Sequence, residues 1–272
     1  MRLIILFSLV FSAVLLWQLY KYVRRTRRQK LFNTPLDANR IALLQEYVTI
    51  YSKLPQTLRE ELHGHINIFL DEKKFIGRDG IALTDEMRVV VAGNACLLLL
   101  QGNKRRFTGF SSILIYPNAY TAHEVQHEGL LTTKKPSTRA GESWVRGPIV
   151  LSWADARRGS VNAEDGHNVV IHEFAHKLDE QSGHMNGLPV LGNASDYKAW
   201  NKVLSEEYNA LHERAKQGGN KVLDAYGMVS PAEFFAVASE SFFEKPVQMK
   251  KRLPELYRQL QTFYNIDPVA WH

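Results

Sequence analysis

The chain has 272 residues, of which 45% are hydrophobic and 23% are charged. This composition supports a packed core and excludes a disordered or collagen-like protein, and a single cysteine excludes a disulfide framework. The formal net charge of +6 would suit a nucleic-acid-binding protein, so the positions of the cations decide what it means.

The positive charge is concentrated at the N-terminus. Residues 1–30 contain seven cations and no acid, whereas residues 31–272 contain 27 cations and 28 acids. The body of the chain is therefore almost neutral, and its sequence has neither a basic patch nor a nucleic-acid-binding motif outside residues 21–30. We expect no nucleic-acid partner.

The first predicted element is an apolar helix over residues 3–20, LIILFSLVFSAVLLWQLY. It would extend about 27 Å, close to the roughly 30 Å hydrocarbon core of a bilayer. Trp17 and Tyr20 stand where aromatic side chains favour the membrane interface, and the cationic run KYVRRTRRQK follows them. A cleaved signal peptide would need its cations before the apolar run, and a buried core helix is the other alternative.

We therefore predict a membrane anchor over residues 1–30, in contact with the bilayer through residues 3–20. The cationic flank predicts a single pass through the cell inner membrane with the N-terminus outside. Residues 31–272 would then form one cytoplasmic catalytic domain.

Helices are predicted on both sides of a central group of strands. Residues 38–71 have apolar side chains at helical spacing, and Thr84 can cap a helix that runs to about Leu100. Short strands are predicted at Ser112–Tyr116 and Pro148–Trp153. This order predicts an α+β fold, in which Cys96 is a small buried hydrophobe.

The chain is predicted to be helical again after residue 166. Glycine-rich turns interrupt this part at 183–192 and 217–220. It contains most of the residues to which we assign chemistry.

The motif His-Glu-x-x-His occurs twice, at His123–His127 and at His172–His176. On a helix, two histidines four residues apart lie on one face and can bind one zinc ion, while the intervening Glu takes a proton from the metal-activated water. Only the second motif lies in an amphipathic helical run, GHNVVIHEFAHKLDE. The first follows a Pro-Asn turn and precedes Gly129, which predicts a hairpin or an exposed loop.

A catalytic zinc needs a third protein ligand. The segment SPAEFFAVASESFFE at 230–244 is apolar and aromatic apart from its acids, and a buried carboxylate needs a partner such as a cation. Glu233 is the leading third ligand, although Ser230 and Glu233 also match a helix capping box. Glu240 shares its face and is either the alternative ligand or a partner of a ligating histidine.

Several blocks of the sequence resemble the Mlc titration factor A family of zinc peptidases. They are GESW-RGPIVLSW at 141–153, GHNVVIHEFAHKLD at 166–179, DAYG at 224–227, SPAEFFAVASESFFEKP at 230–246 and PELYRQLQTFYNIDP at 254–268. The resemblance covers about residues 60–272 and is densest after residue 141.

The resemblance implies a gluzincin-like, zincin-type metallopeptidase domain whose core is related to that of anthrax lethal factor. It implies one Zn²⁺ per chain, with His172, His176 and Glu233 as ligands, Glu173 as the general base and Tyr226 as a residue that assists catalysis. It also implies aminopeptidase activity and binding of the glucose-regulated repressor Mlc. The carboxylate found four residues after the Glu ligand in some gluzincins is Val237 here.

Other residues near the motif have both a functional and a structural interpretation. Tyr226 either donates to the oxyanion or packs beside Gly227, and Gly147–Trp153 forms either a substrate-binding edge strand or an edge covered by a loop. Asp179 and Glu180 orient ligands or are solvated, and His167 is expected to be structural.

Two functions follow from these residues. The main hypothesis is a zinc-dependent peptidase that acts on peptide or protein substrates and is aminopeptidase-like, with a regulatory role as an added possibility. The alternative is a protein that binds and titrates a transcriptional regulator, in which zinc is mainly structural. Glu173 favours catalysis, because a structural zinc needs no base beside it.

Overall fold

The computed structural model describes residues 2–102, 106–128, 131–139, 141–143, 147–216 and 222–271. The predicted turn at 217–220 lies outside these residues. The helices are α1 (Arg2–Phe32), α2 (Ala38–Tyr47), α3 (Thr49–Lys53), α4 (Gln56–Glu72), α5 (Asp85–Leu97), α6 (Trp153–Val161), α7 (Val169–Asp179), α8 (Ala194–Lys216), α9 (Pro231–Glu244), α10 (Pro246–Arg252) and α11 (Pro254–Tyr264). Three short 3-10 helices are η1 (Glu180–Ser182), η2 (Ala225–Met228) and η3 (Pro268–Trp271). The strands are β1 (Lys74–Gly77), β2 (Ser112–Tyr116), β3 (Tyr120–Glu128), β4 (Leu131–Arg139), β5 (Gly141–Ser143) and β6 (Ile149–Ser152).

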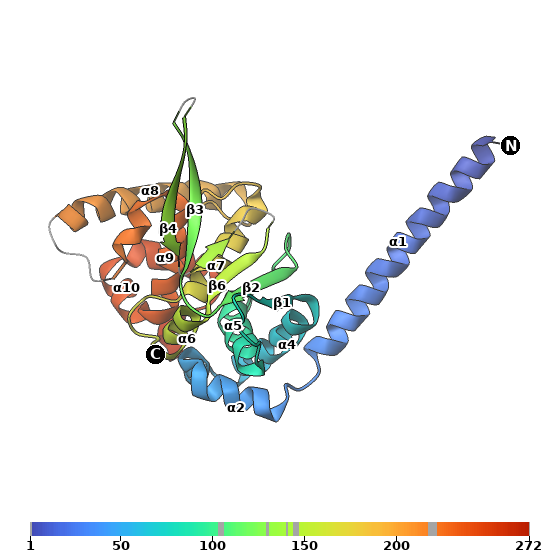
Figure 1. Ribbon diagram of the computed structural model, residues 1–272, viewed down its shortest axis with the longest axis horizontal. Helices are drawn as coiled ribbons and strands as arrows, with labels where there is room; N and C mark the ends of the chain where they lie inside the picture. The colour runs from blue at the N-terminus through green and yellow to red at the C-terminus, as the bar shows by residue number, and fades with distance from the viewer. Residues whose placement is uncertain are drawn as a thin grey trace.

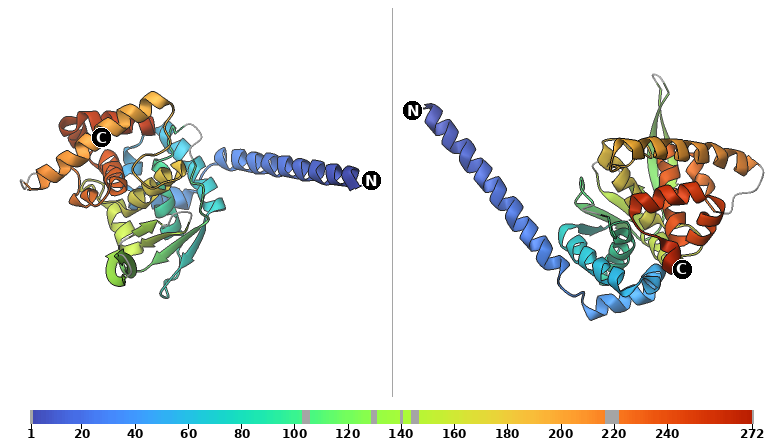
Figure 2. Two further views of the ribbon diagram at one scale, coloured as in Figure 1. Left: turned by 90° about the horizontal axis from the view of Figure 1, so that it is seen from above. Right: turned by 180° about the vertical axis from the view of Figure 1, so that it is seen from behind.

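A small mixed sheet with the strand order β1-β2-β6-β5 lies among the helices (Figure 1). β1 pairs in parallel with β2, and β2 in parallel with β6, with Ile113 opposite Ile149. β5 closes the sheet as an antiparallel partner of β6. A separate antiparallel hairpin, β3-β4, projects from the body (Figures 1 and 2). The predicted α+β class is therefore confirmed.

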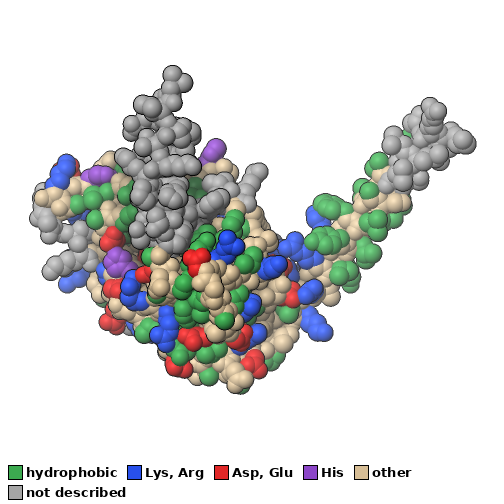
Figure 3. Space-filling model, viewed as in Figure 1, with side chains coloured by type: hydrophobic (Ala, Val, Ile, Leu, Met, Phe, Trp, Pro, Cys, Tyr) green, Lys and Arg blue, Asp and Glu red, His purple; other side chains and the backbone are tan. Residues whose placement is uncertain are grey.

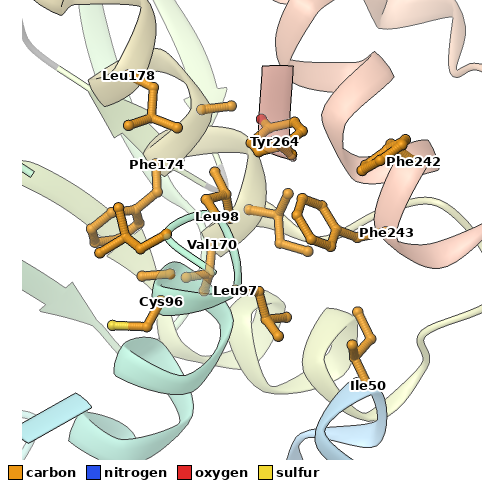
Figure 4. Packing of buried hydrophobic residues seen from close by; sticks show 14 of the residues in the cluster. Ile50, Cys96, Leu97, Leu98, Val170, Phe174, Leu178, Phe242, Phe243 and Tyr264 are labelled. Carbon is orange, nitrogen blue, oxygen red and sulfur yellow. The ribbon is translucent and has the colours of Figure 1, made fainter. Parts of the chain in front are cut away.

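The core forms where α5, α7, α9 and α11 meet (Figure 4). Phe174 of α7, Phe243 of α9 and Tyr264 of α11 are fully buried there. Every residue of α5 from Val89 to Leu97 is buried, which makes this helix a central element of the fold. Cys96 is one of these residues, as predicted, and burial raises the pKa of its thiol, so it packs as a neutral apolar group.

Local sequence signals define most of the helix starts. The Thr84 hydroxyl accepts a hydrogen bond from the Met87 amide and so caps α5, as predicted. Proline occupies the first turn of α9, α10 and α11, where its missing N–H costs nothing. The segment predicted as helical over 38–71 is divided into three helices, with breaks at Val48 and Pro55.

The prediction of a single-pass inner-membrane protein is wrong. Within the described part of the chain, none of the helices combines the length and the apolar character that a bilayer crossing needs. From Lys21 onward, α1 has cations on every turn. The predicted orientation of the chain and the predicted membrane contact of residues 3–20 are therefore also wrong.

The cationic half of α1 packs on α4 instead. Arg28 forms a bidentate ion pair with Glu72, with distances of 2.8 and 2.9 Å, and Arg27 pairs with Asp71. The Phe32 ring lies edge-on to that of His65, with centroids 5.2 Å apart. α4 allows this close approach at Gly64, where an added Cβ would stand 2.7 Å from the Phe32 carbonyl oxygen. The predicted cationic flank is thus partly neutralised by acids of the body.

A buried polar network joins α5, α6 and the start of α7. The Asn94 side-chain amide of α5 donates to the Ser160 hydroxyl of α6 at 2.7 Å and accepts from the Asn168 amide, which precedes α7, at 3.0 Å. The Ser160 hydroxyl in turn donates to the Tyr47 carbonyl oxygen. Because buried polar groups must be satisfied, this network fixes how the three helices meet.

Replacing Asn94 with Leu should lower the free energy of unfolding by about 2–3 kcal/mol, because Ser160 and Asn168 would each lose a buried hydrogen-bond partner. Denaturant unfolding followed by circular dichroism measures the change. Thr84→Ala, which removes only the cap of the same helix, should cost about 1 kcal/mol. Equal losses in the two variants would contradict the role given to the network.

Candidate metal centre

Helix α7 carries the second His-Glu-x-x-His motif. Asn168 caps the helix by accepting hydrogen bonds from the amides of Val170 and Ile171 at 3.2 and 3.1 Å. One face of α7 enters the core, while His172 and His176 lie toward α9 and Glu173 lies against Gly141 of β5. Glu173 and His176 are buried, and His172 is partly buried.

Helix α9 carries the predicted third ligand. Its cap is the Ser230 hydroxyl, which accepts from the Glu233 amide at 3.2 Å. The Glu233 carboxylate does not complete the capping box: its Oε2 lies 2.8 Å from His172 Nε2 and 3.3 Å from His176 Nε2. Ser230 therefore satisfies the helix end, and the carboxylate is left to face the two histidines.

These three donors converge on one point. The two Nε2 atoms of His172 and His176 are 3.2 Å apart, and the three donor atoms, one from each residue, all lie within 4.8 Å of one another. Ligands about 2.0–2.2 Å from a tetrahedral zinc stand about 3.3–3.5 Å from each other. The separations of 3.2 and 3.3 Å match this, and the 2.8 Å between Glu233 and His172 is about 0.5 Å shorter. Two imidazoles with one carboxylate form a donor set that zinc prefers. The identity and spacing of His172, His176 and Glu233 therefore suit the binding of one metal ion.

Glu240 holds the first histidine from behind. Its Oε1 accepts a hydrogen bond from His172 Nδ1 at 2.8 Å, and its Oε2 accepts from the backbone amide of Asn168 at 2.6 Å. Because Nδ1 is engaged in this way, Nε2 is the nitrogen that faces Glu233 and His176. Glu240 thus lies on the far side of the ring from the convergence point, in the place of a partner to a ligating histidine.

The charges of the centre are strongly coupled. Burial alone would lower the pKa of His172, but the carboxylates of Glu240 and Glu233 outweigh it and raise that pKa well above its usual value. Burial alone would raise the pKa of Glu233, but hydrogen bonds from His172 and His176 hold it well below its usual range. The protein therefore keeps Glu233 ionised, which is the state that a metal ligand requires.

Tyr226 borders the same centre from η2. Its ring centroid lies 5.9 Å from that of His172, and its side chain is 53% exposed. The turn is shaped by Asp224, whose carboxylate accepts from the Tyr226 amide at 2.7 Å. A tyrosine with this much exposure beside the histidines does not serve as core packing.

In the part of the chain that the structure describes, no hydrogen bond joins Asp179, Glu180 or His167 to the convergent donors. Asp179 is fully buried and accepts from the Gly187 amide, and burial raises its pKa to about 6. Glu180 pairs with Lys177 at 3.0 Å, and His167 lies 3.5 Å from Asp224. Glu180 and His167 are thus held in contacts around α7, whereas Asp179 also lies near enough to His176 for that residue to oppose the rise in its pKa.

The segment Gly147–Trp153, which contains β6, was predicted to lie at an edge of the sheet, and this prediction is wrong. β6 pairs with β2 on one side and with β5 on the other, so Pro148 precedes an interior strand. The terminal strands of the described sheet are β1 and β5, and β5 was not predicted from the sequence. A Cβ added at Gly141 would stand 2.5 Å from Glu173 Oε1, so β5 places bare backbone against this carboxylate. The glycine at the start of the GESW block was the available signal.

The first His-Glu-x-x-His motif lies in the hairpin, as predicted. His123 and His127 belong to β3 and pair in register with Pro136 and Thr132 of β4. Residues four apart on a strand are separated by about 13 Å, too far for one metal ion to bind both. The motif therefore lacks the helix that gives its spacing meaning.

A helix with two converging histidines, a glutamate from a second helix and a carboxylate beside the first histidine define a metallopeptidase-type centre. The comparisons agree. The model of the glucose-regulated metallo-peptidase M90 family matches residues 22–265, and the chain belongs to this family.

Relatives of similar length support the assignment. An uncharacterized protein of Synechocystis sp. is 37% identical over 245 residues, which cover 89% of each chain. Mlc titration factor A of Pectobacterium atrosepticum is 34% identical, covering 82% of this chain and 84% of its own. Mlc titration factor A of Yersinia pestis is 33% identical, covering 82% and 83%. The predicted family is confirmed.

The loop between η1 and α8 approaches the start of α9 through backbone alone. Gly187 adopts φ +76°, its amide donates to Asp179 and its carbonyl accepts from the Trp200 indole at 2.9 Å. A Cβ added here would stand 2.4 Å from the Pro231 carbonyl oxygen, at the start of α9. The loop thus pins the turn that carries Glu233.

Gly187→Ala should weaken metal binding at least tenfold, because the clash with Pro231 displaces the first turn of α9. Competition with a chromogenic chelator measures the affinity. Gly183→Ala is the matched control: Gly183 has φ +101° but open space around it, so alanine there pays only the left-handed strain of about 1–2 kcal/mol. Metal affinity that falls equally in both variants would show that backbone strain, and not the contact with α9, is responsible.

Proposed function

We propose that the protein is a zinc-dependent peptidase whose catalytic domain includes residues 31–272, with one Zn²⁺ held by His172, His176 and Glu233. The observation that carries the proposal is the convergence of these three side chains beside a buried Glu173. A structural zinc is closed by four protein ligands, whereas a catalytic zinc keeps one position open. Three donors with a carboxylate alongside match the second pattern.

Each residue has a separate task in this proposal. Zinc, when bound, would polarise the substrate carbonyl and lower the pKa of a water molecule from 15.7 towards about 7. Glu173 takes the proton of the attacking water and returns it to the leaving amine. Tyr226 donates a hydrogen bond to the oxyanion, and Glu240 keeps His172 in the orientation that directs Nε2 at the metal.

Among the described strands β5 has no partner on its outer side, and this edge suits an extended substrate. A peptide that adds to this edge would run along Gly141–Ser143, and the lack of a side chain at Gly141 lets its backbone approach Glu173. The resemblance to the Mlc titration factor A family supports an aminopeptidase preference. The substrate is therefore proposed to be an extended peptide with its N-terminal residue at the metal.

Glu173→Gln should retain one zinc per chain and lose about 10²–10⁴ of the rate, because the amide cannot accept the proton of water. Glu233→Gln should instead lower zinc affinity, because a neutral amide replaces the ionised ligand. Zinc content by atomic emission and the hydrolysis of amino-acid anilides and peptides test both. Glu206→Gln, the same change on the exposed side of α8, should alter neither.

The two variants fail differently if the proposal is wrong. Full activity in Glu173→Gln with zinc bound would remove the general base from the mechanism. Normal zinc affinity in Glu233→Gln would mean that Glu233 is not a ligand, despite its contacts with both histidines.

Tyr226→Phe should lower kcat about ten- to a hundredfold while KM and zinc content stay close to those of the unaltered protein, because only the hydroxyl that stabilises the oxyanion is lost. Steady-state kinetics on an anilide substrate separate the two parameters. A rise in KM at constant kcat would assign Tyr226 to substrate binding instead.

The names of the relatives favour a second function, the binding of a regulator. Several are called Mlc titration factor A, and we propose regulator binding as the alternative role of this chain. The Glu173→Gln variant distinguishes the two roles, since binding alone does not require a base.

A further inference from the structure

A cleft of about 980 Å³ lies between α1 and α4, away from the metal centre. Its walls carry six cations and two carboxylates, and its cations are Lys21, Arg24, Arg25, Arg28, Lys73 and Arg106. Lys and Arg side chains gather at the junction between α1 and the body (Figure 3). The volume is at the upper end of the range for small-molecule sites.

The two carboxylates do not neutralise this charge. Glu72 is already paired with Arg28 and lies 3.5 Å from Arg24, and Glu61 accepts from the Gln101 amide at 2.8 Å. Among the described residues, neither Arg25 nor Arg106 has a hydrogen-bond or ion-pair partner for its side chain, and both are exposed. The cleft therefore has guanidinium groups that are available to a ligand.

Crowding of like charges is visible in the buried part of the cleft. Burial lowers the pKa of Lys73 to about 8, and the nearby Arg28 and Arg24 add to this effect, while Glu72 opposes it. The Lys73 ammonium donates to the carbonyl oxygens of Phe107 and Phe110 at 2.8 Å each. An anion in the cleft would relieve the repulsion among these cations.

Apolar and aromatic surface lies beside the cations. Trp17 and Tyr20 of α1 line the outer part and are 56% and 62% exposed, and the Lys21 ammonium lies 3.4 Å from the Trp17 ring centre. Phe69 and Phe107 form the inner wall, with ring centroids 6.2 Å apart. Both rings also pack on Phe174 of α7, at 5.5 and 4.7 Å, so this wall is preformed by the core.

We propose that this cleft binds a phosphate monoester that carries an aromatic or alkyl group. Guanidinium forks match the oxygens of phosphate, and the aromatic walls accept the apolar part of the same molecule. The site uses no residue of the metal centre, so it stands independently of the peptidase proposal.

The test measures binding of three probes to the full chain by isothermal titration calorimetry. 1-Naphthyl phosphate represents a soluble aromatic ester, decyl phosphate below its micelle concentration represents a lipid headgroup, and inorganic phosphate is the charge alone. At least one of the two esters should bind one per chain and at least tenfold more tightly than inorganic phosphate. The tighter ester identifies the source of the ligand.

The Arg25→Glu/Arg106→Glu double variant should weaken binding of that ester at least tenfold without changing the thermal unfolding curve, since both side chains are exposed and unpaired among the described residues. Lys30→Glu is the matched control: it reverses a charge on the exposed surface of the same helix outside the cleft, and should alter affinity less than twofold. Absence of ester binding, equal affinity for inorganic phosphate, or equal loss in Lys30→Glu would overturn the proposal.

Discussion

A single buried carboxylate couples the two helices on which the metal centre depends. Glu240 of α9 accepts from the backbone at the start of α7 and from the ring of His172, four residues further on. Burying a carboxylate is costly unless its oxygens are satisfied, and here each oxygen has a partner from α7 at 2.8 Å or less. The helix pair can therefore adopt few other registers, and the register that satisfies Glu240 is the one that brings Glu233 against both histidines.

A second buried carboxylate of α9, Glu244, must also be satisfied, and it continues the polar contact with the start of α7. Glu244, one turn beyond Glu240, accepts from the side-chain amide of Asn168 at 3.1 Å. Burial, together with the nearby Glu240, raises the pKa of Glu244 well above its usual value. The neutral form of Glu244 is thus favoured, which avoids two adjacent buried charges. Asn168 then caps α7 with its side-chain oxygen and reaches Asn94 of α5 and Glu244 of α9 with its side-chain nitrogen, so the start of α7 is built into the contact with two other helices.

Helix caps and the helical metal-binding motif could be predicted from the sequence, whereas the order of the strands in the sheet could not. Caps such as Thr84 and Ser230 act within three residues, and the flanking apolar pattern was enough to separate the helical His-Glu-x-x-His motif from the one in the hairpin. Glu233 presented a choice between cap partner and ligand. The Ser230 hydroxyl accepts from the Glu233 amide, and the Glu233 carboxylate lies against both histidines. The edge position of β5 depends on pairing with a strand that follows it in the chain, and a proline next to β6 suggested the wrong edge. No pattern in the strands themselves specifies that order.

Charge that is separated along the sequence is joined in space. The first thirty residues hold cations without acids and the rest is almost neutral, which favoured an independent anchor with a cationic flank. The structure instead pairs Arg27 and Arg28 with Asp71 and Glu72, so acids of the body are matched by cations of α1. The family match begins at residue 22, at the start of this packed half. The second half of α1 therefore belongs to the folded body, and its remaining cations line the cleft because only part of their charge finds a carboxylate in α4.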